Sequence, residues 1–378
     1  MKTVILACAL LITSLAAGTT LHAQTAAAEP VTTVDRAAVV ADGIEYLRTA
    51  GQAEDGTFTI QAGPGLTALA LTALLRNDVP LDDPMVAKGF KALEGFVKPD
   101  GGIYGNGRLK NYETCVAILA FNEANADKRY DKIIADANKF VRGLQYGATS
   151  GQDEENVWYG GVGYGGPERP DLSNTSYLID ALNAVDAPSD DEAIQRALVF
   201  VSRCQNLEGA GNDTQFAGKV KDGGFYYVVP TESVDPSEDE RYTANGGLRS
   251  YGSMTYAGFK SMVYAGLTKE DPRVKAALEW IGNNYSVTEN PGQGTAGLFY
   301  YYNTFGSALD AADLEAVVDG DGQSHDWRTD LTAELAKRQN DDGSWANENR
   351  QWFENDKNLA TAFALLALSH CSDDDVGK

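Results

Sequence analysis

Apolar residues recur at helical spacing through most of the chain, and the stretches that carry them come in pairs. In the segment 331–370, Leu331 and Leu335 fall on one face of a helix whose other face is polar. A turn containing Asp342-Gly343-Ser344-Trp345 follows, and 359–368 is then apolar on nearly every side. Because an amphipathic helix is typical of an outer position and an all-apolar helix of a buried one, this segment predicts a hairpin of one outer and one inner helix.

The same unit recurs upstream, which indicates a repeat protein. Glycine-aromatic turns follow one another at about 45 to 75 residues, the period of a helix hairpin. The fifth turn is predicted at 297–302, in the sequence Gly-Leu-Phe-Tyr-Tyr-Tyr. The predicted inner helices are 65–75, 111–122, 172–185, 251–264, 308–318 and 359–368. Six matched units with inner helices apolar on both sides favour closure, so the predicted fold class is an all-α α/α toroid: six helical hairpins, with inner and outer helix rings, in one domain from 34 to 372.

The two ends of the chain differ from the repeats. Residues 1–23 contain Lys2, an apolar run and a small-residue stretch ending at Ala23, which is the layout of a secretory signal peptide. The apolar run is shorter than a membrane span requires. Residues 24–33 are expected to form a flexible tether and 373–378 an acidic tail. The protein is therefore expected to be exported, to the periplasm or the extracellular space.

Charge and cysteine content narrow the partners. The formal net charge of −23 disfavours nucleic acid and anionic membrane surfaces, since both need basic patches. The expected partner is a small molecule, no cofactor is expected, and the oligomeric state stays open. Without residues 1–23 the chain keeps Cys115, Cys204 and Cys371, which permit one disulfide and a leftover thiol, or no disulfide.

Two motifs carry a resemblance to a known superfamily. Gln339-x-x-x-Gly343-x-Trp345 resembles the QW-type motif of squalene–hopene cyclases. The turn followed by an apolar inner helix resembles the β subunits of protein prenyltransferases. The resemblance extends over essentially all of residues 34–372 and implies the terpenoid cyclase/protein prenyltransferase toroid.

The active-site motifs of these families are not kept. The cyclases protonate a polyene with an Asp-x-Asp-Asp motif whose middle Asp is the acid, and the similar frame here begins at Asp171 and continues with Leu172, Ser173 and Asn174. A serine hydroxyl is far too weak an acid for that step. At the positions resembling the prenyltransferase zinc ligands the chain has Ser253 and Ala360. The resemblance thus implies the fold without either known chemistry.

Aromatic residues at the turns are the main binding candidates. The set comprises Tyr104, Trp158, Tyr164, Phe225, Tyr226, Tyr227, Phe299, Tyr300, Tyr301, Trp345 and Trp352. Around one mouth of a toroid they would hold an isoprenoid chain by apolar contact or a sugar by stacking. The alternative is that they plug hairpin ends, as expected of Trp345 and Phe225. With three tyrosines from inner helices (Tyr177, Tyr251 and Tyr256), the ligand-binding candidates are Tyr104, Trp158, Tyr164, Tyr177, Tyr226, Tyr251, Tyr256, Tyr301 and Trp352.

Carboxylates supply the catalytic candidates. Glu113 and Asp180 lie inside apolar helices, and if they face a dry cavity they would have a raised pKa and could act as acid or base. Asp171 is a further candidate, as a carboxylate of a carbohydrate-active enzyme. The alternative for Glu113 and Asp180 is structural pairing with a neighbour such as Arg108 or Arg249.

One polar loop offers two further candidates. His325 is a candidate general base, because an imidazole titrates near neutral pH. Asp319, Asp321 and Asp326 form a weak candidate calcium site. The alternative is a solvated loop in which Asp326 caps the next helix.

Three functions stay open from the sequence. The first is an exported binding protein that holds an apolar, isoprenoid-like ligand or a glycan in its central cavity. The second is a divergent enzyme, cyclase-like, prenyltransferase-like or carbohydrate-active, and a pair of carboxylates facing one cavity would favour it. The third is a structural or interaction scaffold, which predicts a cavity filled by side chains.

Overall fold

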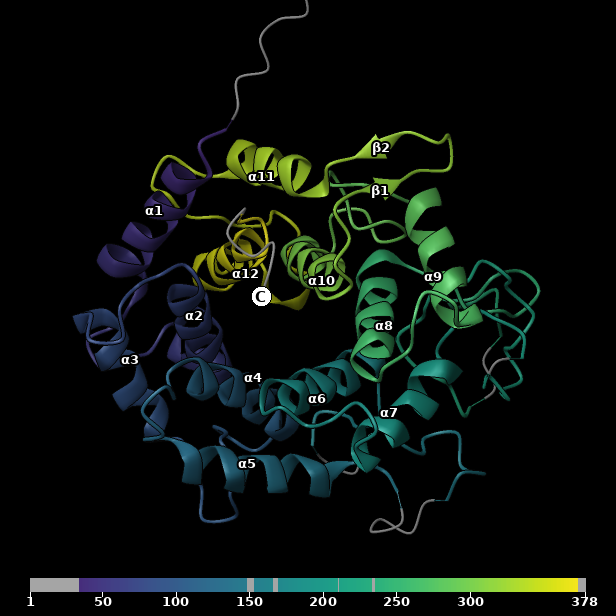
Figure 1. The fold of residues 1–378 in the computed structure, drawn as a ribbon, viewed down its shortest axis with the longest axis horizontal. Coiled ribbons are helices and arrows are strands. Elements are labelled where there is room, and N and C mark those ends of the chain that lie inside the picture. Colours follow the sequence, from purple (N-terminus) through teal and green to yellow (C-terminus); the bar gives the residue numbers. More distant parts are fainter. Residues whose placement is uncertain (1–33, 148–152, 166–168, 210, 233–234, 373–378) are drawn as a thin grey trace, which may run out of the picture. The chain divides into compact units, whose positions relative to one another are not determined.

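The protein is described here by a computed structural model that covers residues 34–147, 153–165, 169–209, 211–232 and 235–372. Within these ranges it contains twelve α-helices and one two-stranded antiparallel ribbon (Figure 1). The helices are α1 (Arg36–Tyr46), α2 (Pro64–Arg76), α3 (Pro84–Glu94), α4 (Lys110–Glu123), α5 (Asp131–Leu144), α6 (Leu172–Ala184), α7 (Glu192–Arg203), α8 (Gly252–Tyr264), α9 (Pro272–Asn283), α10 (Leu298–Ala311), α11 (Trp327–Arg338) and α12 (Lys357–Ser369). The ribbon pairs β1 (Val317–Val318) with β2 (Ser324–His325). The predicted signal peptide (1–23), tether (24–33) and tail (373–378) lie outside the described residues.

The helices of residues 34–372 form two concentric rings (Figure 1). The even-numbered helices form the inner ring: each packs against the next, and α12 packs against α2, which closes the ring. The odd-numbered helices lie outside, and each is joined along the chain to the inner helix that follows it. The predicted all-α toroid of six hairpins is therefore confirmed.

The burial of the helices follows their apolar patterns. In α12 every residue from Asn358 to Ser369 is buried, as expected of a helix with neighbours on all sides. In α5 only Ile134, Ala137 and Val141 are buried, one stripe facing the inner ring. Position in the inner or outer ring is thus set by how many faces of the helix are apolar.

A glutamine in most turns joins one unit to the next. The side-chain amide of Gln145 donates to the carbonyl of Gly160 in its own unit (2.9 Å) and to that of Ala193 at the start of α7 (2.8 Å). Gln52 and Gln205 make the corresponding pairs of bonds. Gln339 donates to Gly343 and to Val39 of α1, so the same device joins the sixth unit to the first.

A glycine in these turns lies against the backbone of the next outer helix. Gly160 has a φ of +83°, and a Cβ placed on it would lie 1.8 Å from the carbonyl oxygen of Arg196. Gly343 lies in the same way against Asp42 of α1. Only glycine combines a positive φ with so close an approach, which explains the recurring Asp-Gly and Gly-Gly pairs.

The residue at the tip of each such turn is fixed by a threonine of its own inner helix. The Trp345 N–H donates to the hydroxyl of Thr361 in α12 (3.0 Å), and the Phe225 N–H to that of Thr255 in α8 (3.1 Å). Equivalent bonds join Phe58 to Thr67, Ile103 to Thr114, and Val162 to Thr175. Trp345 and Phe225 are both fully buried, which confirms that they plug hairpin ends.

The fifth unit departs from the predicted pattern. Gly297 is the N-cap of α10, so the aromatic run after it is the first part of the inner helix and not a turn. The predicted inner helix at 308–318 was therefore wrong in position: α10 spans Leu298–Ala311, and β1 (Val317–Val318) lies at the end of the predicted range. Asn290 serves as the turn residue instead: its side chain accepts from the N–H of Ser253 and donates to the carbonyl of Ala296.

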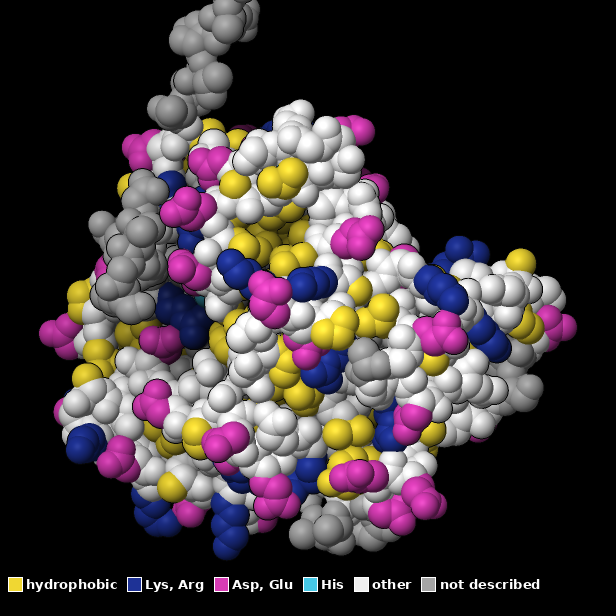
Figure 2. Space-filling model, turned by 45° about the vertical axis from the view of Figure 1, so that its right-hand side comes forward, with side chains coloured by type: hydrophobic (Ala, Val, Ile, Leu, Met, Phe, Trp, Pro, Cys, Tyr) yellow, Lys and Arg dark blue, Asp and Glu magenta, His cyan; other side chains and the backbone are white. Residues whose placement is uncertain are grey.

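Some expectations about chemistry and surface are also tested. Cys115, Cys204 and Cys371 are buried free thiols, so among these three no disulfide forms. Of the helices described, none is long and apolar enough to cross a membrane. On the face shown in Figure 2, acidic and basic side chains are interspersed without a broad basic surface.

Candidate functional site

A cavity of roughly 470 Å³ lies where the N-terminal ends of the six inner helices converge. The third residue of every inner helix lines it: Leu66, Tyr112, Asn174, Met254, Tyr300 and Leu359. The third residue of a helix lies in its first turn. The first turns of all six inner helices therefore form the wall of the cavity.

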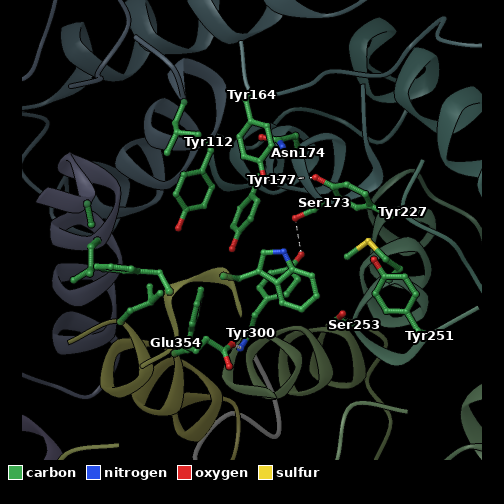
Figure 3. Close-up of a pocket in the computed structure, with 18 of the residues that line it drawn as sticks. Tyr112, Tyr164, Ser173, Asn174, Tyr177, Tyr227, Tyr251, Ser253, Tyr300 and Glu354 are labelled. Atoms are coloured by element: carbon green, nitrogen blue, oxygen red, sulfur yellow. Dashed lines mark hydrogen bonds between the residues drawn. The ribbon is translucent and has the colours of Figure 1, made fainter. Parts of the chain in front are cut away.

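Tyrosines dominate the wall of this cavity. The side chains of Tyr112, Tyr164, Tyr177, Tyr227, Tyr251 and Tyr300 surround the space (Figure 3). The ring of Tyr177 lies edge-on to that of Tyr112, with centroids 5.1 Å apart. Burial raises the pKa of the Tyr112, Tyr177 and Tyr300 phenols, so these groups stay neutral. The wall is thus largely apolar, with a few uncharged hydroxyls.

The mouth of the cavity carries two exposed aromatic side chains. Trp352 and Phe353 are 58% and 46% exposed, and both line the cavity. Their φ angles of +53° and +67° are left-handed, a conformation that costs roughly 1–2 kcal/mol per residue. The Trp352 ring lies over Gly297, where a Cβ would come within 2.9 Å of it. Strained backbone bearing exposed aromatics is characteristic of ligand-contacting segments.

Glu354 is the carboxylate among the described residues that line the cavity. One of its oxygens accepts from the N–H of Tyr300 (2.8 Å) and the other from the side-chain amide of Asn347 (2.7 Å). Burial raises the pKa of Glu354 despite these bonds. Through the bond to the Tyr300 N–H, Glu354 holds the start of α10 in place.

Asp171, the remaining acid of the cyclase-like frame, lies behind the cavity wall. It is the N-cap of α6, where one oxygen accepts from the Asn174 N–H (2.8 Å) and the other from the Asn174 side-chain amide (2.9 Å). Burial raises the pKa of Asp171 to about 6. Ser173 does line the cavity, and its hydroxyl is hydrogen-bonded to that of Tyr300 at 2.9 Å. The position resembling the family's proton donor thus faces the cavity, with a hydroxyl in place of a carboxyl.

Asp171→Asn is expected to remove a pH dependence of stability. Because the pKa of Asp171 is higher in the folded chain, about 6, than the ordinary value of about 4, the folded state binds the extra proton between these values. The stability that Asp171 contributes is therefore fully present below about pH 4. As the pH rises through about 6, the free energy of unfolding falls by roughly 3 kcal/mol. Thermal unfolding from pH 4 to 7 should show the variant gaining stability relative to the wild type as the pH rises. Parallel curves for the two proteins would contradict this.

The other acids have structural partners, and those partners are not the predicted ones. Glu113 accepts from the Gly105 N–H (3.0 Å), and Asp180 pairs with Lys260 (2.8 Å), so Arg108 and Arg249 were wrong as partners. Both acids nevertheless have structural partners, which is the alternative stated for them from the sequence. Neither acid lines the tyrosine cavity, so no pair of carboxylates faces it among the described residues.

The polar loop near β2 has the role of a structural connection. His325 lies between Asp319 (2.8 Å) and Asp330 (3.5 Å) and stacks on Tyr285, and it does not line the cavity. Asp326 caps α11 by accepting from the Thr329 N–H. Among the residues the structure covers, no group of three His, Cys, Asp or Glu side chains could hold a metal ion, so Asp319, Asp321 and Asp326 do not form the calcium site considered above.

Four of the nine ligand-binding candidates line the cavity: Tyr164, Tyr177, Tyr251 and Trp352. Tyr104 and Trp158 do not, because they belong to turns at the outer ring. Tyr104 stacks on Phe140 of α5, and Trp158 packs on Tyr146.

Tyr226, Tyr256 and Tyr301 are also excluded from the cavity wall. The hydroxyl of Tyr226 donates to the carbonyl of Arg203, and that of Tyr301 to the carbonyl of Ser286. Tyr256 is fully buried against Tyr301, between α8 and α10. These side chains fill the space between the rings.

Sequence reasoning missed part of the wall. Tyr227 and Tyr300 belonged to the wider aromatic set without being chosen, and Tyr112, Phe353, Glu354 and Phe363 were not considered. The third-residue rule would have found Tyr112 and Tyr300, given the starts of the inner helices.

Comparisons with known proteins concern the fold. No protein-family model and no curated protein matches the sequence. A solved structure described as a novel alpha-amylase from Clostridium perfringens is similar, with a TM-score of 0.50, 12% identity, and coverage of 88% of this chain and 97% of that one. The type II terpene cyclase MstE from Scytonema is similar at a TM-score of 0.48 and 12% identity, over 88% of this chain and 97% of that one. At such identities a likeness shows fold alone. The closed ring of six hairpins gives the chain an all-α toroid fold.

Proposed function

We propose that this protein binds an apolar, isoprenoid-like ligand in the tyrosine-lined cavity and leaves it chemically unchanged. The observation that carries the proposal is the cavity wall: neutral tyrosines and aliphatic side chains from all six inner helices around roughly 470 Å³. Burial of an apolar chain in such a site gains about 25 cal/mol per Å² of surface removed from water. The predicted export of the chain is part of this proposal.

The wall also supports orientation of a ligand that ends in an oxygen. The hydroxyl of Tyr177 is buried with no hydrogen-bond partner in the structure, whereas those of Ser173 and Tyr300 are bonded to each other. A few placed hydroxyls in an otherwise apolar pocket are the usual means of fixing a ligand's direction. An isoprenoid alcohol matches this combination of surfaces.

Two features argue against chemistry on the ligand. Protonation of a polyene needs a strong acid aimed at it, and Ser173 occupies the position that resembles the family's acid. Glycoside hydrolysis needs two carboxyl groups flanking the bond, and Glu354 alone, with both oxygens engaged, lines the described wall.

Binding is tested with purified protein, geranylgeraniol and maltoheptaose, using native mass spectrometry and tryptophan fluorescence. Geranylgeraniol should be retained, and the emission of the exposed Trp352 should shift to the blue as the mouth loses water. Tyr112→Ala should weaken geranylgeraniol binding about tenfold. The expected loss corresponds to about half of the apolar contact of a large, fully buried side chain. Tyr104→Ala is the matched control, since Tyr104 lies outside the cavity, and should leave affinity unchanged.

The other outcomes are equally informative. Retention of maltoheptaose without retention of geranylgeraniol would indicate that the ligand is a glycan and not an isoprenoid. Chromatography of the extracted ligand distinguishes binding from catalysis, because a cyclised product has the same mass as its substrate. A cyclised product that forms with the wild type and not with Asp171→Asn would show that the protein is an enzyme. Equal loss of binding in Tyr112→Ala and Tyr104→Ala would show that the cavity is not the binding site.

A further inference from the structure

A second cavity, of roughly 220 Å³, lies among the C-terminal halves of the same inner helices. Arg76 ends α2, Tyr264 ends α8, and His370 is the C-cap of α12; all three line it. Tyr177 lines both cavities, so its ring forms part of the wall between them. The toroid therefore has a separate recess at each end of its inner helices.

The lining of the second cavity is polar where that of the first is apolar. Amide and hydroxyl side chains from four inner helices face it: Thr72, Asn122, Asn183, Asn303 and Ser307. The side chains of Asn122 and Asn303 are half-buried and that of Asn183 is exposed. Amides and hydroxyls can both donate and accept, which suits a ligand with several hydroxyl groups.

The charged groups of this cavity are paired with one another. Lys260 is buried and lies 2.8 Å from Asp180, and its ammonium group also donates to the hydroxyl of Ser307 (3.3 Å). Arg76 lies 2.6 Å from Glu123. Two cations and two anions balance, so neither an anionic nor a cationic ligand finds an uncompensated partner among them.

Two buried acceptors at this end have no partner within the structure. The second carboxylate oxygen of Asp180 is one, and Nε2 of His370 is the other. His370 Nδ1 lies 2.8 Å from a carboxylate oxygen of Asp310, which fixes the proton on Nδ1. Burial lowers the pKa of His370, so the ring is neutral and Nε2 is an acceptor.

The helix ends add partial negative charge. The C-terminus of an α-helix carries a partial negative charge, and residues from the C-terminal halves of all six inner helices line this recess. We propose that the second cavity is a binding site for a small, neutral, polyhydroxylated ligand, a sugar or cyclic polyol, that donates hydrogen bonds to Asp180 and His370. This inference does not depend on the ligand of the first cavity.

Saturation-transfer NMR and calorimetry with myo-inositol and glucose test the site, with choline and cyclohexanecarboxylate as charged comparison ligands. A polyol should bind more tightly than either ion. Asn303→Leu should weaken polyol binding about tenfold, the factor associated with loss of one hydrogen bond, and should leave geranylgeraniol binding unchanged. Tyr112→Ala should do the reverse, because Tyr112 lines only the first cavity.

Asn183→Leu is the second site variant, since an exposed side chain can be replaced without affecting folding, and it should also weaken polyol binding. Octyl glucoside separates the sources of a sugar: equal affinity for it and glucose indicates a free sugar, and much tighter binding indicates the sugar head group of a lipid. Preferential binding of an ion, absence of polyol binding, or polyol affinity that neither Asn variant changes would overturn the inference.

Discussion

Replacing Trp345 by alanine is expected to lower the free energy of unfolding by about 4 kcal/mol, the usual cost of deleting a large buried aromatic side chain. Trp345 is fully buried, and its indole N–H donates to the carbonyl of Leu335 at 2.8 Å. Its ring packs over Gly43 of α1, where a Cβ would lie 2.8 Å from it. The side chain thus fills the space between the last and first units, so the variant leaves a cavity at the closure of the ring.

Chemical denaturation followed by circular dichroism measures this effect. The matched control is Trp352→Ala, which removes the same side chain from an exposed position at the cavity mouth. Its cost should be within about 1 kcal/mol, as for most surface substitutions. Similar losses in both variants would contradict the role assigned to Trp345.

Lys260→Met is expected to cost about 3 kcal/mol of stability. Lys260 and Asp180 form an ion pair whose side chains are 7% and 13% exposed, so removing the ammonium group leaves a carboxylate charge poorly solvated. Breaking a buried pair at one partner is strongly destabilising for this reason, whatever the net contribution of the pair.

The double variant Lys260→Met with Asp180→Leu separates these two quantities. If the loss comes from the stranded charge, the double variant should recover most of it, because apolar residues of similar size often replace a buried pair at little cost. Thermal and denaturant unfolding of the wild type, the two single variants and the double variant measures the coupling. A double variant as unstable as the sum of its single changes would show that the pair is not coupled in this way.

The fold was largely predictable from the sequence because its determinants are local. All-apolar stretches mark the inner helices, amphipathic stretches the outer ones, and Asp-Gly pairs the turns that need a positive φ. The prediction for the fifth unit was wrong because these local signals differ there. Asn290 replaces the Asp-Gly turn, and Gly297 caps a helix whose first residues are aromatic. A glycine before aromatic residues is compatible with both a turn and a helix start.

The site was predictable only in part because its geometry depends on helix register. Tyr177 and Tyr251 were identified as cavity residues, whereas Tyr256 and Tyr301 were placed wrongly. A shift of one residue turns a helical side chain by about 100°, and sequence patterns fix helix ends only to within a few residues. The partner of Asp180 is eighty positions away in α8, and no local pattern reveals such a contact.

The hydrogen bond from the Gln339 side chain to the Val39 carbonyl, which joins the last unit to the first, affects how the protein unfolds. In an open array of repeats, each end unit has one neighbour, so unfolding starts by fraying at the ends. Here every unit has two neighbours, and no unit can leave without breaking two interfaces at once. Loss of any one hairpin therefore exposes the walls of both adjacent ones, which favours a single cooperative transition for the whole ring over stepwise loss from its termini.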